Sequence, residues 1–81
     1  RGKLTLRRGP VELAAVVEHA VEAARPLVEQ NGHELTVALP PDPVVVLGDL
    51  TRLAQVVGNL LTNSAKYTPR GGRIAVTAAR E

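Results

Sequence analysis

Hydrophobic residues recur every three or four positions between residues 11 and 30, which is the spacing of an amphipathic helix. Glutamate and arginine occupy the other positions, so we expect about five helical turns with one apolar and one charged face. Pro26 lies inside this helix and removes one backbone donor, which predicts a kink or a loosened last turn. Asn31 and Gly32 predict its end, with Gly32 in the left-handed conformation that glycine adopts readily.

The same spacing returns after Asp49, which is a suitable N-cap because its carboxylate can accept hydrogen bonds from the first turn of a helix. The pattern continues to about Lys66 or Tyr67. Residues 68–72, with the sequence Thr-Pro-Arg-Gly-Gly, predict the end of this second helix.

Four segments have the pattern of strands. Apolar and polar residues alternate in residues 4–8, 33–39 and 73–78, as expected for strands with one buried face. Residues 9–10 are Gly-Pro and predict the end of the first strand. Residues 44–47 are Val-Val-Val-Leu, a β-branched run that is typical of a more buried strand.

The resulting order, β-α-β-β-α-β, predicts an α+β fold, an α/β two-layer sandwich with both helices on one face of a small mixed sheet. Segments 33–39 and 44–47 are separated by a proline-rich turn, and we expect them to pair as a hairpin. A chain of 81 residues forms at most one small domain. We expect residues 1–81 to be the N-terminal portion of a single, incomplete domain.

The composition narrows the class of protein. Tyr67 is the only aromatic residue and there is no Phe, Trp or Met, so the core must consist of small aliphatic side chains. The lack of cysteine excludes disulfides and thiolate metal sites and favours a cytoplasmic location. No apolar run approaches the ~20 residues of a membrane span. The sequence is also compatible with a parent protein that is anchored in the inner membrane.

Ten basic and eight acidic residues give a net charge of +2, and the basic residues are scattered along the chain. Nucleic-acid binding usually requires a basic patch interleaved with aromatic side chains. The sequence has neither, so we expect no nucleic-acid partner.

The second predicted helix has an unusual polar stripe, formed by Gln55, Asn59, Asn63 and Lys66. The nearly opposite side holds Leu53, Val57, Leu60, Leu61 and Ser64. A solvated helix face is normally built from Glu, Lys, Arg and Asp, because asparagine competes for backbone hydrogen bonds and is a poorer helix former. Two asparagines four residues apart on one face therefore require an explanation.

The stripe suits a metal-triphosphate group. The side-chain oxygens of Asn59 and Asn63 are hard, neutral ligands for Mg²⁺, which usually takes one or two protein oxygens together with substrate phosphates. Lys66 offers a point positive charge to those phosphates, and Tyr67 offers a ring face or hydroxyl to a nucleotide. The alternative is an ordinary solvated face whose asparagines cap or pack locally, since short patterns recur by chance.

At these positions the chain resembles bacterial sensor histidine kinases. The similar residues run Asp49-x-x-Arg52-Leu53-x-Gln55-Val56-Val57-x-Asn59-Leu60-Leu61-x-Asn63-Ser64-Ala65-Lys66-Tyr67-Thr68-Pro69-x-Gly71-Gly72. This run is similar to the N-box of their catalytic ATP-binding domain, which has the Bergerat-type fold shared with gyrase, Hsp90 and MutL. The preceding helix and strands also match, so the resemblance covers essentially the whole chain.

The resemblance implies a role for each residue of the motif. Asn63 would be the Mg²⁺ ligand that links the ion to the ATP phosphates, and Asn59 would help to hold phosphate, metal or its water. Lys66 would contact phosphate, and Tyr67 would lie against the nucleotide. The implied activity of the parent is transfer of the ATP γ-phosphoryl group to a histidine. The implied partners are dimerisation and phospho-acceptor helices and, downstream, a response regulator.

Two features of the family are missing from the sequence. Nothing after Gly72 resembles the D-x-G-x-G box that binds adenine, so we expect the chain alone to have little or no kinase activity. The acceptor histidine of the family lies on an upstream helix. His33 is followed by Glu and Leu like that acceptor, but it comes after a helix-stopping Asn-Gly, so we interpret it as a structural or surface histidine. We expect His19 at the surface.

Two other functions stay open. If further strands are missing, the last strand, residues 73–79, has an unpaired edge, which favours a self-associating, non-catalytic interaction module. Another ATPase of the same superfamily, such as an anti-sigma-factor kinase, also carries an asparagine-bearing helix. The Lys-Tyr-Thr-Pro-x-Gly-Gly ending of the motif favours the sensor kinases.

Overall fold

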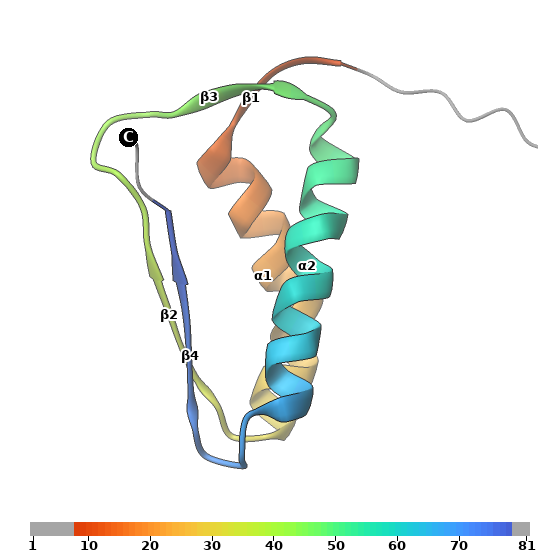
Figure 1. Ribbon diagram of the computed structural model, residues 1–81, viewed down its shortest axis with the longest axis vertical. Coiled ribbons are helices and arrows are strands. Elements are labelled where there is room, and N and C mark those ends of the chain that lie inside the picture. Colours follow the sequence, from red (N-terminus) through yellow and green to blue (C-terminus); the bar gives the residue numbers. More distant parts are fainter. Residues whose placement is uncertain (1–7, 79–81) are drawn as a thin grey trace, which may run out of the picture.

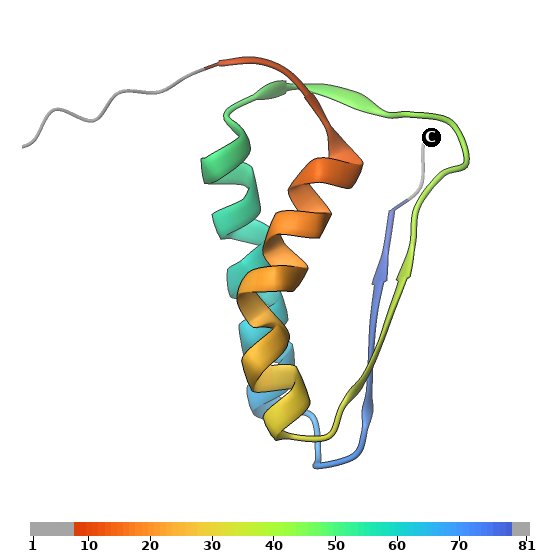
Figure 2. The same cartoon turned by 180° about the vertical axis from the view of Figure 1, so that it is seen from behind.

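The computed structural model describes residues 8–78. The elements in chain order are β1 (Gly9–Glu12), α1 (Leu13–Gln30), β2 (Glu34–Ala38), β3 (Val45–Gly48), α2 (Leu50–Tyr67) and β4 (Arg73–Thr77). Figure 1 shows α1 and α2 side by side, with β2 and β4 in a second layer beside them, and Figure 2 shows the same arrangement from behind. The predicted order of elements and the α+β class are confirmed.

The strands form two pairs. β1 pairs antiparallel with β3 and places Val11 opposite Val46. β2 pairs parallel with β4 and places Thr36 opposite Ala75. The predicted hairpin between β2 and β3 is therefore wrong. Residues 39–44, which join these two strands, include three prolines. Proline favours extended backbone and lacks the N–H that a ladder needs, so this segment carries β3 away from β2.

The first strand lies later in the chain than predicted, because it begins at the Gly-Pro pair that is expected to end it. β1 starts at Gly9, and Pro10 lies within it, opposite Leu47. Each strand of a two-stranded pair has an open edge, and proline is tolerated in strands where its missing N–H faces such an edge. Residues 4–7, which form most of the predicted first strand, lie outside the described residues.

The prediction of a buried strand at residues 44–47 is also wrong. Val45 is 56% exposed and Leu47 is 81% exposed. Val45 and Leu47 are two residues apart and therefore lie on the same face of the β1-β3 pair, and within residues 8–78 no layer covers that face. An apolar run alone does not bury a strand that has no layer packed on both of its faces.

α1 confirms the predicted amphipathic helix and continues past Pro26 to Gln30. It begins at Leu13 because residues 11–12 belong to β1. It ends as predicted, with Gly32 at a φ of 64°. Within residues 8–78, the main cluster of buried side chains is aliphatic and consists of Val17, Ala20, Val21, Ala24 and Val28 from α1, Leu61 and Ala65 from α2, and Ile74 from β4. Within residues 8–78, no helix is long and apolar enough to cross a membrane.

Candidate functional site on helix α2

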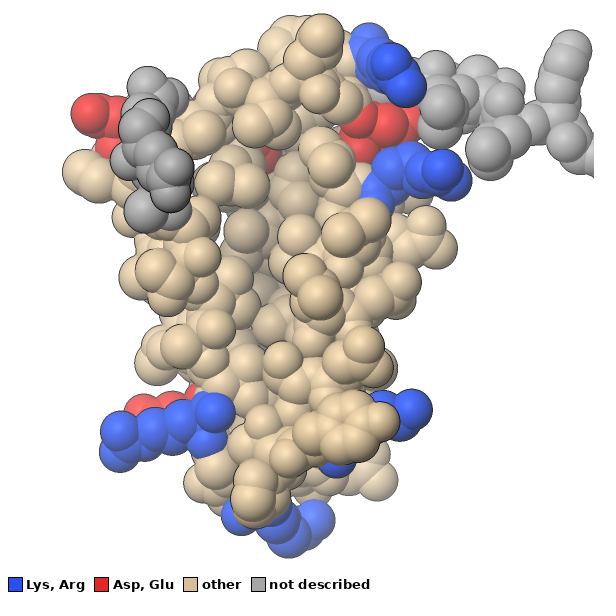
Figure 3. Space-filling view, in the orientation of Figure 1, with Lys and Arg blue, Asp and Glu red and all other residues tan. Residues whose placement is uncertain are grey.

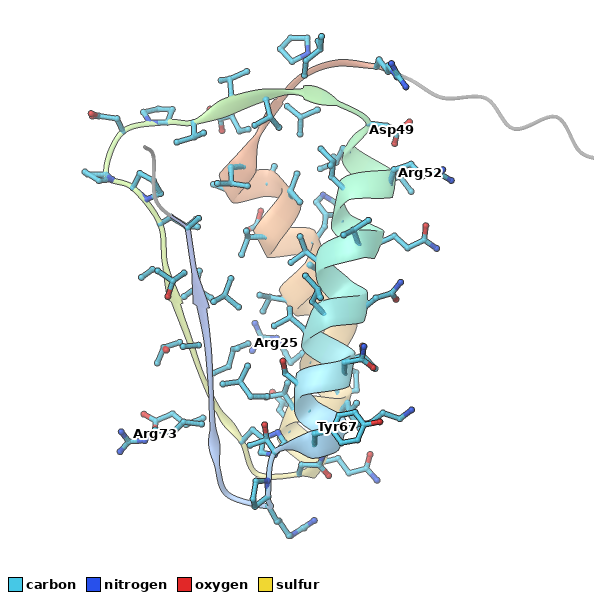
Figure 4. The ribbon with its side chains drawn as sticks, viewed as in Figure 1. Arg25, Asp49, Arg52, Tyr67 and Arg73 are labelled. Carbon is cyan, nitrogen blue, oxygen red and sulfur yellow. The ribbon has the colours of Figure 1, made fainter. Side chains whose placement is uncertain are left out.

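The start of α2 is fixed by Asp49, as the sequence predicts. The backbone N–H of Arg52 donates to Oδ1 of Asp49 at 3.1 Å, and the N–H of Leu53 donates to the carbonyl oxygen of Asp49 at 2.9 Å. Figure 4 shows Asp49 and Arg52 at one end of α2 and Tyr67 at the other. The helix is continuous between them, so residues four apart lie one above the other along its length.

The buried face of α2 is rotated relative to the prediction. Leu61 and Ala65 are 4% and 1% exposed, whereas Leu60, which the sequence places on the buried side, is 62% exposed. Ser64 is exposed as well. α2 packs mainly against α1 and contacts β4 much less, so the residues that face α1 become buried. Leu60 and Val56 form an exposed apolar strip next to the polar stripe.

The structure brings the predicted site residues together on one exposed face. Asn59, Asn63 and Lys66 lie on successive turns, and all three are exposed. Tyr67 follows at the end of the helix and is 83% exposed. Among the described residues, none of these four side chains makes a hydrogen bond or an ion pair. Their polar atoms are therefore free to bind a ligand.

The charge of α2 favours an anionic ligand. The helix contains no acidic residue, and its charged side chains are Arg52 and Lys66. Figure 3 shows a largely uncharged face, with Lys and Arg concentrated towards its ends. The ion pairs of Arg25 with Glu22 and of Arg73 with Glu34 use no residue of α2. A phosphate group near Asn59, Asn63 and Lys66 meets no repelling carboxylate from α2 itself, because the capping Asp49 stands at the other end of the helix.

The chain leaves α2 through a tight turn. The N–H of Thr68 donates to the carbonyl oxygen of Ser64 at 2.9 Å, and its hydroxyl donates to the same oxygen at 2.6 Å. The N–H of Gly72 donates to the carbonyl oxygen of Pro69 at 2.9 Å. A Cβ at Gly72 would lie 2.6 Å from Cγ2 of Thr68, so only glycine fits this position. The backbone beside the site is thus closely fixed.

His33 contacts this turn and is a structural histidine, which is one of the two alternatives that the sequence leaves open. It is 8% exposed, and its Nε2 lies 3.1 Å from the carbonyl oxygens of both Thr68 and Pro69. The sequence does not predict these partners, because they are 35 and 36 residues away along the chain. His19 is exposed on α1, as predicted.

The donor set at the site suits one class of metal ion. Within residues 8–78, no group of three or more His, Cys, Asp or Glu side chains is placed to hold a metal. Three amide oxygens remain on the polar face of α2, those of Gln55, Asn59 and Asn63, and the pair nearest to Lys66 is Asn59 and Asn63. Two neutral oxygens fit an ion such as Mg²⁺, which keeps several waters and completes its coordination with phosphate oxygens.

The fold is that of a histidine kinase catalytic domain. The mycobacterial sensor histidine kinase MprB matches with a TM-score of 0.80 and 31% identity, over 93% of this chain and 48% of that chain. The catalytic domain of the histidine kinase ThkA matches with a TM-score of 0.83 and 19% identity, over 93% of this chain and 51% of that chain. This chain thus corresponds to about half of each solved structure.

Sequence relatives belong to the same class. The histidine-protein kinase BaeS of Escherichia coli strain K12 is 38% identical over 79 residues, which is 98% of this chain and 17% of BaeS. The probable sensor histidine kinase TcrY of Mycobacterium tuberculosis is 44% identical over 66 residues, which is 82% of this chain and 14% of TcrY. No family model matches. The chain belongs to the sensor histidine kinases, in the region of their catalytic domain.

Proposed function

We propose that this chain is the part of a sensor histidine kinase that binds the phosphates of ATP through Mg²⁺. The observation that carries the proposal is the exposed face of α2. It presents two amide side chains and one ammonium group on successive turns, all without a partner within residues 8–78. The helix that carries them has no acidic residue. The kinase relatives support ATP as the ligand of this face.

In this proposal Asn63 supplies the amide oxygen that binds the metal, and Asn59, one turn earlier, holds phosphate, metal or its water. Lys66 pairs with phosphate oxygens as a point charge. Tyr67 lies against the nucleotide. When bound, Mg²⁺ neutralises part of the triphosphate charge that develops during phosphoryl transfer. The chain itself contributes position and positive charge.

We further propose that the parent kinase transfers the γ-phosphoryl group to a histidine outside this chain. In that step an imidazole nitrogen would form a bond to the γ-phosphorus, the bond from this phosphorus to the β,γ-bridging oxygen would break, and ADP would leave with that oxygen and its electron pair. His33 is buried against two carbonyl oxygens and is unsuited to this attack. The acceptor would lie on the dimerisation and phospho-acceptor helices of the parent, with a response regulator downstream. A cytoplasmic location stays a prediction from the cysteine-free composition.

The chain alone should bind nucleotide weakly and show little or no autophosphorylation. It corresponds to about half of the solved catalytic domains that it matches, so much of the contact surface for a nucleotide belongs to the rest of such a domain. Autophosphorylation or sub-micromolar binding by the 81-residue chain would contradict this expectation.

The direct test is an NMR titration of the chain with Mg·ATP. Its three asparagines are Asn31, Asn59 and Asn63, and their side-chain amide signals can be followed separately. We expect Asn59 and Asn63 to shift in the presence of Mg·ATP and to shift less when the metal is chelated. Asn31 is an internal reference, because its Nδ2 donates to the carbonyl oxygen of Ala65 instead of facing the stripe.

Uniform small shifts over all three asparagines, or none at millimolar Mg·ATP, would overturn the proposal. Another ATPase of the superfamily, such as an anti-sigma-factor kinase, is a less supported alternative, because the relatives reported above are histidine kinases. A non-catalytic self-associating module is the other alternative, and the exposed apolar residues of β3 and α2 favour it.

A further inference from the structure

The turn that follows α1 is bonded to the end of α2 at several points. The N–H of Gly71 donates to the carbonyl oxygen of Asn31 at 3.0 Å, and Nδ2 of Asn31 donates to the carbonyl oxygen of Ala65 at 3.4 Å. The N–H of Glu34 donates to the carbonyl oxygen of Gly72 at 2.9 Å. With the His33 contacts, these bonds join residues 31–34 to residues 65–72. We call residues 31–34 the α1 turn and residues 68–72 the exit loop.

The surroundings of His33 determine which of its ring nitrogens carries a proton. Its Nε2 faces the carbonyl oxygens of Thr68 and Pro69, each at 3.1 Å. Carbonyl oxygens can only accept, so Nε2 must be the donor. Its Nδ1 is buried and has no hydrogen-bond partner within residues 8–78. A neutral ring with its hydrogen on Nε2 is therefore the form that fits, and one N–H is shared between two carbonyls.

These two carbonyls stand directly after the site. Lys66 and Tyr67 form the last turn of α2, and the peptide groups that follow them belong to Thr68 and Pro69. The side chains of Lys66 and Tyr67 have no contacts of their own that would hold them, because both are exposed and neither has a polar partner within residues 8–78. Their placement depends on the backbone, which ends a helix where fraying is normal.

We propose that His33 is a positioning residue for the phosphate site. Through the carbonyls of Thr68 and Pro69 it holds the exit loop in one conformation, and thereby fixes the direction in which Lys66 and Tyr67 meet a bound nucleotide. This inference rests on the proposed function, because it assigns those two residues to the nucleotide. It extends that proposal to a side chain on the far side of the turn, which touches neither metal nor phosphate.

Three substitutions of His33 distinguish the effect of its Nε2–H donor from the effect of the volume of its ring. His33→Gln keeps an N–H donor near the position of Nε2. His33→Asn keeps an amide of the same polarity but ends too short to reach both carbonyls. His33→Leu fills the volume without any donor. The matched control is His19→Leu, because His19 is the other histidine of the chain and is exposed on α1.

The first measurement uses the chain without ligand. We expect amide hydrogen exchange of Thr68, Gly71 and Gly72 to accelerate about tenfold in the Leu and Asn variants and to stay within about twofold of wild type in the Gln variant. Tyr67 is the only aromatic residue, so its ring signals and fluorescence report the same loosening without interference. Exchange of core amides on α1, such as that of Val21, should not change. These readouts distinguish local positioning from a general loss of stability.

The second measurement is the Mg·ATP titration. The Leu and Asn variants should bind about fivefold to tenfold more weakly, and the Gln variant should recover most of the affinity. If the Leu variant does not fold, the comparison of the Gln variant with the Asn variant still tests the positioning role. Both substitutions place an amide side chain at this buried position, so they should lower the stability of the fold by similar amounts. The inference is wrong if the Gln variant binds Mg·ATP as weakly as the Asn variant does. It is also wrong if all variants have a lower melting temperature but the same hydrogen exchange in the exit loop as wild type.

The two proposals fail in different ways. If wild type shows no response of Asn59 and Asn63 to Mg·ATP, the proposed function is wrong. The ligand-free exchange and the Tyr67 signals then still decide whether His33 holds the exit loop. If wild type responds and the His33 variants respond equally, the function stands and the positioning role of His33 is wrong.

Discussion

At the scale of single residues, Asn59 and Asn63 are both exposed, and neither side chain has a polar partner within residues 8–78. Asparagine is a poorer helix former than alanine, so these positions lower helix stability without gaining a hydrogen bond in return. Residues that break a local rule without compensation are expected at functional sites. The conflict between the low helix propensity of asparagine and its position inside a helix is visible in the sequence, because it lies within one helix. It could not show the partners of His33, which belong to another element.

Replacing Asn63 by alanine should separate function from stability. Alanine is the better helix former, so the variant should be as stable as wild type or more stable by about 0.5 kcal/mol. If Asn63 binds the metal as proposed, the Mg·ATP affinity should fall by about tenfold or more, because the metal loses a protein ligand. Thermal unfolding and the NMR titration measure the two effects. Ser64→Ala is the matched control, an exposed neighbour off the stripe, and should leave binding unchanged. Wild-type affinity in the Asn63 variant would exclude its role.

At the scale of elements, sequence patterns predict the two helices and three of the four strands to within about two residues, because helix caps and periodicity are local. They do not predict strand pairing. The choice of β4 as the partner of β2 depends on chain segments about 40 residues apart, and three prolines prevent the nearer pairing. The rotation of the buried face of α2 is also not predicted, because it depends on where α1 packs, and α1 is distant from α2 along the chain.

Two glycine substitutions should change stability in opposite directions. Gly58 lies inside α2, and a Cβ there would meet nothing within 4 Å, so Gly58→Ala should stabilise the chain by about 0.5–1 kcal/mol. A Cβ at Gly72 would lie 2.6 Å from Cγ2 of Thr68 and 2.9 Å from the carbonyl oxygen of Pro69. Gly72→Ala should therefore destabilise it by about 1–3 kcal/mol. Urea denaturation measures both. If both variants changed the free energy of unfolding by the same amount and in the same direction, the close packing of the exit loop around Gly72 would be contradicted.

At the scale of the whole molecule, the described chain is thin, with extents of 39 × 38 × 17 Å. A slab of this shape buries few side chains, and those in its core are small aliphatics from two helices and one strand. Large apolar residues remain at the surface, with Leu47 at 81% and Leu60 at 62% exposure. Within residues 8–78, β2 and β4 also have no further strand beside them. Such surfaces and strand edges favour association between chains.

We therefore expect the isolated chain to associate as its concentration rises. The variant Leu47→Gln with Leu60→Gln should shift the equilibrium towards monomer by about tenfold, because two exposed leucines no longer gain free energy by burial. Analytical ultracentrifugation over a concentration series measures this. Glu18→Gln, on the exposed face of α1, is the control and should have no effect. A strict monomer at high concentration in wild type would exclude the self-associating alternative.

The parallel pairing of β2 with β4 makes α2 a part of the connection between these strands. Parallel strands require a crossover, and here the chain passes through β3 and α2 before it returns as β4. Since α2 is part of this crossover, we expect a ligand that binds α2 only in the folded chain to favour the pairing of β2 with β4 as well, by mass action. Strand amides far from the stripe should then exchange more slowly as Mg·ATP is added. On the proposed function, the concentration of Mg·ATP would then also set the fraction of the chain that is folded.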